Sequence, residues 1–183
     1  MSKFTNHTDG LPGPQGPKGD PGDDALGILA MQYGSFSSLI TQTGTVNSIQ
    51  PVYCEVTEFN KGIVMENSSG GTTNASRIKI LNIGRYNIQF SLQVHQGNSS
   101  GVVNLWLRKN GTDVPNSKTK FNVTANNPYY VAAWNFFVEA NPNDYYELIW
   151  SSTSATTHIE YVDTVAGHPA VPSVILTIHQ IGL

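Results

Sequence analysis

The stretch RYNIQFSLQVH, residues 85–95, decides the fold of most of this 183-residue chain. Its apolar side chains alternate with polar ones along the whole stretch: Tyr86, Ile88, Phe90, Leu92 and Val94. A period of two with one apolar face is typical of a half-buried strand in an antiparallel sheet. Gly84 stands before the stretch and marks a turn. The segment therefore predicts a sheet that packs one face against a core.

Working outward, the same kind of pattern fills the chain from residue 34 to residue 183. Strand-like segments recur at 102–109, 129–138 and 174–178, and Asn110-Gly111 is a hairpin signal because both residues tolerate positive φ. No convincing helical period interrupts them. About ten strands in a head of this length predict an all-β fold, an antiparallel jelly-roll sandwich.

Several of these strands carry large apolar side chains on both faces. A lone sandwich needs only one apolar face for each sheet, so the excess favours an interface between chains. The alternative is that these side chains close the ends of the sandwich. The candidate trimer-interface residues are Trp106, Tyr129, Tyr130 and Trp134.

Residues 10–24 read GLPGPQGPKGDPGDD and form a different kind of segment. Glycine stands at every third position, and prolines fill many of the places between. In a collagen triple helix only glycine fits at the crowded axis, while proline favours the extended strand. We expect a short collagen-like stem, and a stiff Pro/Gly linker is the alternative. The predicted triple-helix glycines are Gly10, Gly13, Gly16, Gly19 and Gly22.

Two short segments flank the stem. Residues 1–9 form a polar arm, in which Lys3 and Phe4 are candidate residues for anchoring the chain to a particle. Residues 25–33 are a connector with an apolar stretch, which is either a helical turn or the start of the first strand. A stem this short should not hold three chains together alone, so we expect the head to drive assembly.

The segment GRYNIQF, residues 84–90, resembles the G-x-Y-x-(aromatic or aliphatic)-x-F strand of the complement-subcomponent-q and tumour-necrosis-factor-like superfamily. The motif residues are Gly84, Tyr86, Ile88 and Phe90. Segments 105–111, 138–150 and 173–178 resemble later strands of that family in the same order, with Asn143 where glycine is usual. The resemblance implies a ten-strand jelly roll that forms a threefold trimer and binds ligands by loops and surfaces rather than catalysing a reaction.

The sequences of residues 101–117 and 132–150, together with the proline-containing stretch 167–172, resemble collagen-containing virion proteins of tailed bacteriophages more than they resemble complement proteins. This resemblance implies a capsid-decoration or fibre-like virion protein, assembled in the host cytoplasm, whose head stabilises the capsid, binds a host-surface glycan, or both. Its other partners would be capsid or tail proteins. The alternatives are a secreted, extracellular recognition protein of the complement type and a bacterial or spore-surface adhesin.

The composition excludes other classes of function. The net charge of −3 and the absence of a basic patch argue against nucleic acid as a partner. No run of 18 apolar residues predicts a membrane span, and no apolar signal-peptide core stands at the N-terminus. We therefore expect a chain that is released by lysis or carried in a particle, or one whose export signal was removed.

The sequence also lacks the signatures of catalysis. It contains no nucleophile elbow, phosphate-binding loop or dinucleotide fingerprint, so we expect no enzyme and no cofactor. No two histidines have metal-ligand spacing on one element, which predicts no transition-metal site. The resemblance also implies calcium binding by loop carboxylates near the threefold axis, for which Glu139, Asp144 and Asp163 are the candidates. The single cysteine, Cys54, lies in an alternating apolar stretch that predicts a buried, unreactive thiol.

Overall fold

The computed structural model describes residues 15–16, 18–19 and 31–183, and the chain divides into two units, residues 1–30 and residues 31–183. In the described part of the second unit there are fourteen strands, all paired antiparallel, and no helix. Ten of those strands have four or more residues. The all-β, antiparallel prediction is therefore confirmed for this unit.

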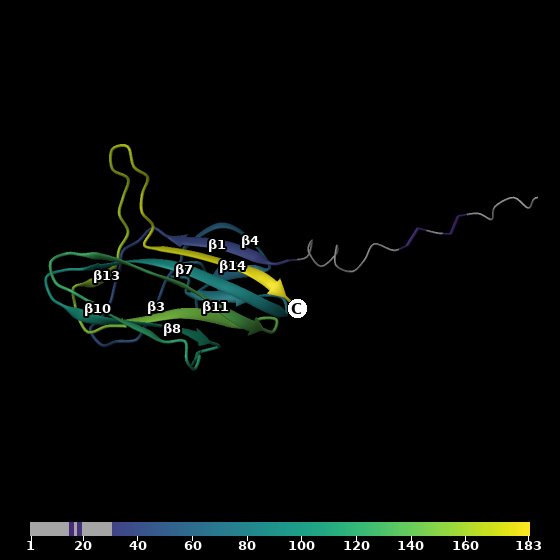
Figure 1. Ribbon diagram of the computed structural model, residues 1–183, viewed down its shortest axis with the longest axis horizontal. Coiled ribbons are helices and arrows are strands. Elements are labelled where there is room, and N and C mark those ends of the chain that lie inside the picture. The colour runs from purple at the N-terminus through teal and green to yellow at the C-terminus, as the bar shows by residue number, and fades with distance from the viewer. Residues whose placement is uncertain (1–14, 17, 20–30) are drawn as a thin grey trace, which may run out of the picture. The chain divides into compact units, whose positions relative to one another are not determined.

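One layer of the sandwich, here called sheet A, is built around the longest strand (Figure 1). Its main strands lie in the spatial order β4 (Val56–Lys61), β1 (Tyr33–Ser38), β14 (Val174–Gly182), β7 (Gly84–Gln96) and β11 (Tyr129–Ala140). The far end of β7 also pairs with β13 (Thr157–Ile159), which in turn pairs with β2 (Gln42–Thr43).

The other layer, sheet B, contains β5 (Ile63–Glu66), β6 (Arg77–Ile80), β12 (Tyr145–Ser152), β8 (Gly101–Lys109) and β10 (Thr119–Val123) in that order. Two very short strands extend it: β3 (Gln50–Pro51) pairs with β12, and β9 (Thr112–Asp113) forms a hairpin with β8. Non-consecutive strands lie side by side in both layers, which is the connectivity of a jelly roll.

Strand β7, which contains the alternating residues 85–95, forms the middle of sheet A and of the core. Tyr86, Ile88 and Phe90 on β7 are buried, and the Tyr86 hydroxyl donates a 2.8 Å hydrogen bond to the carbonyl of Asn82. Inward-facing side chains of sheet B meet them, including Leu105, Leu107, Leu148 and Trp150. The period of two in residues 85–95 therefore places one apolar face on the core, as expected.

Gly84 owes its identity to a close approach between chain segments at the start of β7. A Cβ atom there would lie 2.5 Å from the Gln180 side chain and 2.8 Å from the carbonyl oxygen of Gly182. Backbone atoms cannot give way cheaply, so any larger residue would push β14 away from β7.

The predicted turns have the backbone that their residues favour. Asn110 and Gly111 have φ values of +50° and +81° in the hairpin between β8 and β9. Asn143 has a φ of +70° in the turn between β11 and β12. Asparagine tolerates this left-handed conformation better than most residues with a Cβ, which explains how it replaces the usual glycine there.

The segment between β13 and β14 leaves the sandwich as a projecting hairpin, drawn in yellow-green in Figure 1. Two isolated bridges hold it, one between Val162 and Val171 and one between Val165 and His168. The proline-containing stretch 167–172 lies on the returning arm of this hairpin.

Candidate assembly surface

Strand β11 is the edge of sheet A. It pairs with β7 over its whole length, from Tyr129 opposite His95 to Ala140 opposite Gly84. In the described part of the chain its other side has no partner strand. An edge of this length presents a row of free backbone groups and is a template for a further chain.

The outward-facing side chains of β11 are unusually apolar. Tyr129, Val131 and Phe137 are 59%, 64% and 69% exposed. Single exposed apolar residues are ordinary, but three on one face of one edge strand form a patch. Covering this patch with another protein surface would remove it from water.

The inward-facing side chains of β11 are only partly covered. Tyr130, Trp134, Phe136 and Val138 pack against the core without being fully buried. The Trp134 and Phe136 rings contact Phe90 of the core, with ring centroids 4.7 Å and 5.9 Å away. These contacts anchor the exposed aromatic edge to the centre of sheet A.

Residues from the opposite sheet complete this half-open edge. Phe121 of β10 and Val114 are also partly buried against the core, and the Phe121 ring centroid lies 6.4 Å from that of Tyr130. We define the assembly surface as β11 together with Phe121 and Val114. Most of its side chains are apolar, Asn135 and Glu139 being the exceptions on β11, and β11 is paired with β7 along its whole length.

Three of the four predicted interface residues lie on this surface. Tyr130 and Trp134 face the gap between the sheets, while Tyr129 faces outward from sheet A. Val131 and Phe137 were not among the predicted interface residues, although the apolar residues on both faces of 129–138 could have indicated them.

The fourth predicted residue, Trp106, lies elsewhere. It is on β8 in sheet B, only 7% exposed, and its indole N–H donates a 2.9 Å hydrogen bond to Asp113. The Lys118 ammonium lies 5.8 Å from the centroid of its ring. The second apolar face of β8 is thus covered by its own chain, so Trp106 does not join the surface on β11.

The outer face of sheet A becomes polar next to Tyr129. The His95 ring stacks on Tyr129 with centroids 4.6 Å apart, and its Nδ1 atom lies 3.3 Å from Glu160 Oε2. A second histidine, His158, lies on the neighbouring strand β13 with its ring 6.3 Å away. The hydrogen bond between the Tyr129 hydroxyl and Glu160, together with burial, raises the pKa of Tyr129. His95 is thus held by the Tyr129 ring and lies beside Glu160, but its Nδ1 atom makes no hydrogen bond of good geometry to a described residue.

The three carboxylates suggested for calcium do not come together. Glu139 pairs with Arg85 at the start of β7, at 3.0 Å, whereas Asp163 follows β13 at the opposite end of that strand. Asp144 accepts hydrogen bonds from Lys109, Asn110 and the backbone N–H of Asn141. Burial alone would raise the pKa of Asp144, but these bonds outweigh it and lower the pKa to about 2.

Within residues 31–183 and the four described stem residues, no group of three or more His, Cys, Asp or Glu side chains is arranged to hold a metal ion. The same residues include no helix that is long and apolar enough to cross a bilayer. Cys54 is buried, and burial raises the pKa of its thiol, as expected for an unreactive cysteine.

The stem is only partly described. Gly16 and Gly19 lie among the described residues, and apart from their chain neighbours no described residue comes within 4 Å of where a Cβ atom would stand on either. Gly10, Gly13, Gly22, Lys3 and Phe4 lie outside the described residues, as does most of the connector.

Comparison with known proteins identifies the fold. No family model and no curated protein matches the sequence. Among solved structures, crystal structures of murine APRIL at pH 8.5 and pH 8.0 align with TM-scores of 0.51, at 8% identity, over 82% of this chain and 99% of APRIL. A structure of murine APRIL at pH 5.0 aligns over the same shares with a TM-score of 0.50 and 8% identity. The head therefore shares the fold of these structures, and its two antiparallel sheets have the connectivity of a jelly roll.

Proposed function

We propose that this chain is a non-enzymatic structural protein of a tailed-phage virion that assembles as a homotrimer. In this proposal the jelly-roll head drives assembly, the Gly-X-Y segment at residues 10–24 forms a short triple helix, and the polar arm at residues 1–9 docks to the particle. The head would act in capsid decoration or as a fibre-like element, for capsid stabilisation, host-surface attachment or both.

The observation that carries the proposal is the apolar assembly surface on β11. A contact between this edge and a different surface of the next copy is heterologous, and it closes into a ring when the rotation between copies permits. The tumour-necrosis-factor-like fold and the glycine repeat of a three-chain helix both support a ring of three.

The glycine repeat supports the proposal in a second way. Chains joined through their heads hold their stems at high local concentration, which makes even a short triple helix favourable. Three copies of one head on a common stem would then present three identical binding surfaces, and weak contacts at each would add up to strong attachment.

Sedimentation equilibrium of the full chain tests the trimer. Three chains of 19.9 kDa give a mass of about 59.7 kDa, and we expect that species at micromolar concentrations. A stable species near 20 kDa would remove the basis of the proposal, because neither the stem nor the surface on β11 would then have a partner chain.

Gold labelling with an antibody against the head tests the place of the protein. Label on the capsids of particles from the source culture supports decoration, and label at tail tips supports host recognition. If particles carry no label while cells or medium do, the virion assignment is wrong.

A secreted or cell-surface recognition protein is the second candidate function. The fold shared with murine APRIL, over nearly the whole length of that chain, favours it. This candidate predicts label on cells or in the medium, and it keeps the trimer and the surface on β11 unchanged.

A further inference from the structure

A polar hollow of about 380 Å³ lies on the outer face of sheet B, away from the assembly surface. It is lined by the loop between β5 and β6, by Pro51 and Tyr53, and by Glu147 of β12. Its volume falls in the range of roughly 300–1,000 Å³ that is usual for small-molecule sites. The hollow is therefore large enough for a single small ligand.

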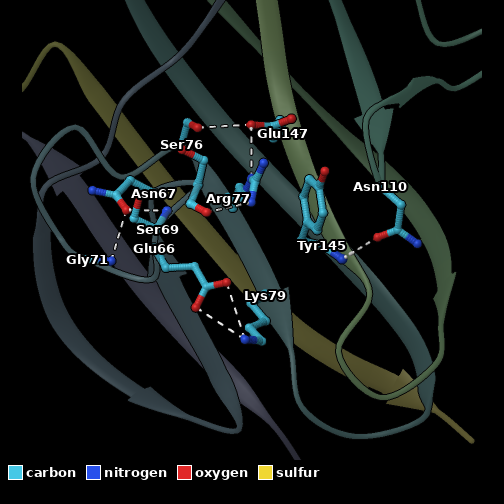
Figure 2. Close-up of polar contacts among 11 residues, drawn as sticks. Glu66, Asn67, Ser69, Gly71, Ser76, Arg77, Lys79, Asn110, Tyr145 and Glu147 are labelled. Atoms are coloured by element: carbon cyan, nitrogen blue, oxygen red, sulfur yellow. Dashed lines mark hydrogen bonds and ion pairs between the residues drawn. The ribbon is translucent and has the colours of Figure 1, made fainter.

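The floor of the hollow is a largely buried carboxylate. Glu147 has 12% of its side chain exposed, and the Ser76 hydroxyl donates a 3.0 Å hydrogen bond to its Oε1 atom. The guanidinium of Arg77 approaches the same oxygen at 3.9 Å. Figure 2 shows the second oxygen pointing away from both partners, and no described residue donates a hydrogen bond to it. One oxygen of this lining carboxylate is thus left without a hydrogen-bond donor from the described residues.

Arg77 provides donors beside this acceptor. Its guanidinium lies 4.4 Å from the centroid of the Tyr145 ring, a contact that fixes its plane. One terminal nitrogen makes a long, 3.5 Å hydrogen bond to the carbonyl of Ser68, and the other, Nη2, has no partner among the described residues. Arg77 and Glu147 therefore form a long ion pair, in which each group keeps a polar atom that has no partner among the described residues.

The wall of the hollow holds its shape without a ligand. Asn67 Oδ1 accepts hydrogen bonds from the backbone N–H groups of Ser69 and Gly71, both at 2.9 Å, and its amide donates to the carbonyl of Thr73 at 2.9 Å. Figure 2 shows the bonds that connect Asn67 to Ser69 and Gly71 within the loop between β5 and β6. A preformed wall reduces the entropy that a ligand would lose on binding.

Asn74 lines the same wall and has a different role from Asn67. Its φ is +51°, and its side-chain amide makes no hydrogen bond to any described residue. Asn74 therefore adds a further donor and acceptor to the residues that line the hollow.

The charges of this face are balanced. Arg77 stands beside Glu147, and the next pair along the sheet, Lys79 and Glu66, is closed at 3.3 Å. A phosphate, sulfate or carboxylate ligand would gain one cation here and meet one anion. Neutral hydroxyl groups suit the site better, because each can donate to a carboxylate and accept from a guanidinium.

We propose that this hollow binds a neutral saccharide through a pair of neighbouring hydroxyl groups. One hydroxyl donates to Glu147 Oε2, and the next accepts from the free N–H groups of Arg77. Tyr53 and Pro51 border the hollow and offer apolar surface to the C–H face of a sugar ring. This proposal specifies the ligand class for the attachment role above and rests on that proposed function for its biological meaning.

Saturation-transfer NMR on the full chain tests the site, with the methyl glycosides of glucose, galactose, mannose and N-acetylglucosamine as probes. We expect transfer from at least one of them at millimolar concentration. Glu147→Gln keeps the shape of the side chain and should weaken that binding about tenfold, because the open oxygen loses its charge. Glu66→Gln is the matched control: it neutralises the adjacent ion pair, whose carboxylate does not line the hollow, and should leave binding unchanged.

Asn74→Gly gives a second test if Glu147→Gln fails to fold. Glycine accepts the positive φ at this position, so the loop keeps its shape and only the amide is lost. We expect binding to weaken several-fold. Equal binding by the wild type and both variants, transfer from none of the four glycosides, or binding only to sialylated or sulfated glycosides would each overturn the proposal.

The result is independent of the assembly test. A trimer that binds no glycoside would remove the saccharide site and leave the proposed function standing. A monomer that binds a glycoside through Glu147 would support the saccharide site and remove the basis of the proposed function.

Discussion

The edge strands of the two sheets differ in length and in chemistry. β11, at the edge of sheet A, has 12 residues with Tyr129, Val131 and Phe137 exposed, whereas β10, at the edge of sheet B, has 5 residues with Lys120 and Asn122 exposed. Short edges with charged or polar side chains are the usual protection against unwanted pairing. β10 has that protection on its outward-facing positions and β11 lacks it, although the inward-facing Phe121 of β10 belongs to the assembly surface.

The outer face of sheet B around the hollow is polar, whereas the outward face of β11 carries large apolar side chains. Its strands β6 and β12 present Arg77, Lys79 and Glu147, which are held in ion pairs around a polar hollow. Apolar groups gain free energy when another protein surface covers them, while partly satisfied polar groups gain little from such burial. In the two proposals above, the edge strand β11 accordingly serves assembly, and the outer face of sheet B around the hollow is left for a ligand.

The largest expected effect comes from a charge on the apolar edge. Val131→Lys would place three ammonium groups inside a trimer, so we expect the 59.7 kDa species, three chains of 19.9 kDa, to dissociate to monomers in sedimentation equilibrium. Asn122→Lys is the control, since it adds the same charge to an exposed position of β10. If both variants stay trimeric, the contrast between the two edges carries no information about assembly.

A core truncation tests how firmly the aromatic edge is attached. Phe90→Ala should lower the free energy of unfolding by about 3–5 kcal/mol, because it leaves a cavity and removes the ring contacts to Trp134 and Phe136. Urea denaturation measures the change. The exposed Phe137→Ala is the matched variant, and its effect on an isolated monomer should stay within about 0.5 kcal/mol.

A smaller effect is expected at the turn that joins the two sheets. Asp144 follows β11 and is bonded to Lys109 and Asn110 of the β8–β9 hairpin. Its pKa of about 2 in the folded chain lies below the ordinary value of 3.8, so the carboxylate stabilises the fold above pH 4 and loses that contribution as the pH falls from about 4 to about 2. Asp144→Asn should cost about 1–2 kcal/mol at pH 7 and less below pH 3, without changing the assembly state.

Thermal melting at pH 7 and pH 2.5 measures this difference. The Asp113→Asn variant is a useful comparison, because its carboxylate also accepts hydrogen bonds but belongs to sheet B alone. An Asp144→Asn penalty that is equal at both pH values would contradict the assignment of the effect to ionisation.

The smallest effect on assembly is expected in the stem. Gly16→Ala should disturb a triple helix, seen as loss of its circular-dichroism signal, while the head remains trimeric. Dissociation of the head by this change would mean that the stem, and not the edge on β11, drives assembly. An unchanged signal would favour the stiff linker over the triple helix.

The alternation of apolar and polar residues in 85–95 was sufficient to predict β7 and its buried face. Successive side chains of any strand point to opposite faces of the sheet, so this pattern depends on the strand alone. Likewise, Asn110-Gly111 predicted its turn, since the left-handed backbone is a preference of the residues themselves. Trp106 shows where this reasoning ends. A large apolar side chain on an outer face predicts exposure, but Asp113 and Lys118 of the same chain cover it.

The sequence by itself determined an all-β antiparallel head, its turns, and a glycine repeat of collagen type. Only the tertiary structure decided which apolar face stays open, because β11 became an edge through its pairing with β7 some 45 residues earlier in the chain. It also brought Arg77 of β6 beside Glu147 of β12, which no local pattern relates. Periodicity depends on neighbours in sequence, whereas edges and polar hollows depend on which distant strands lie side by side.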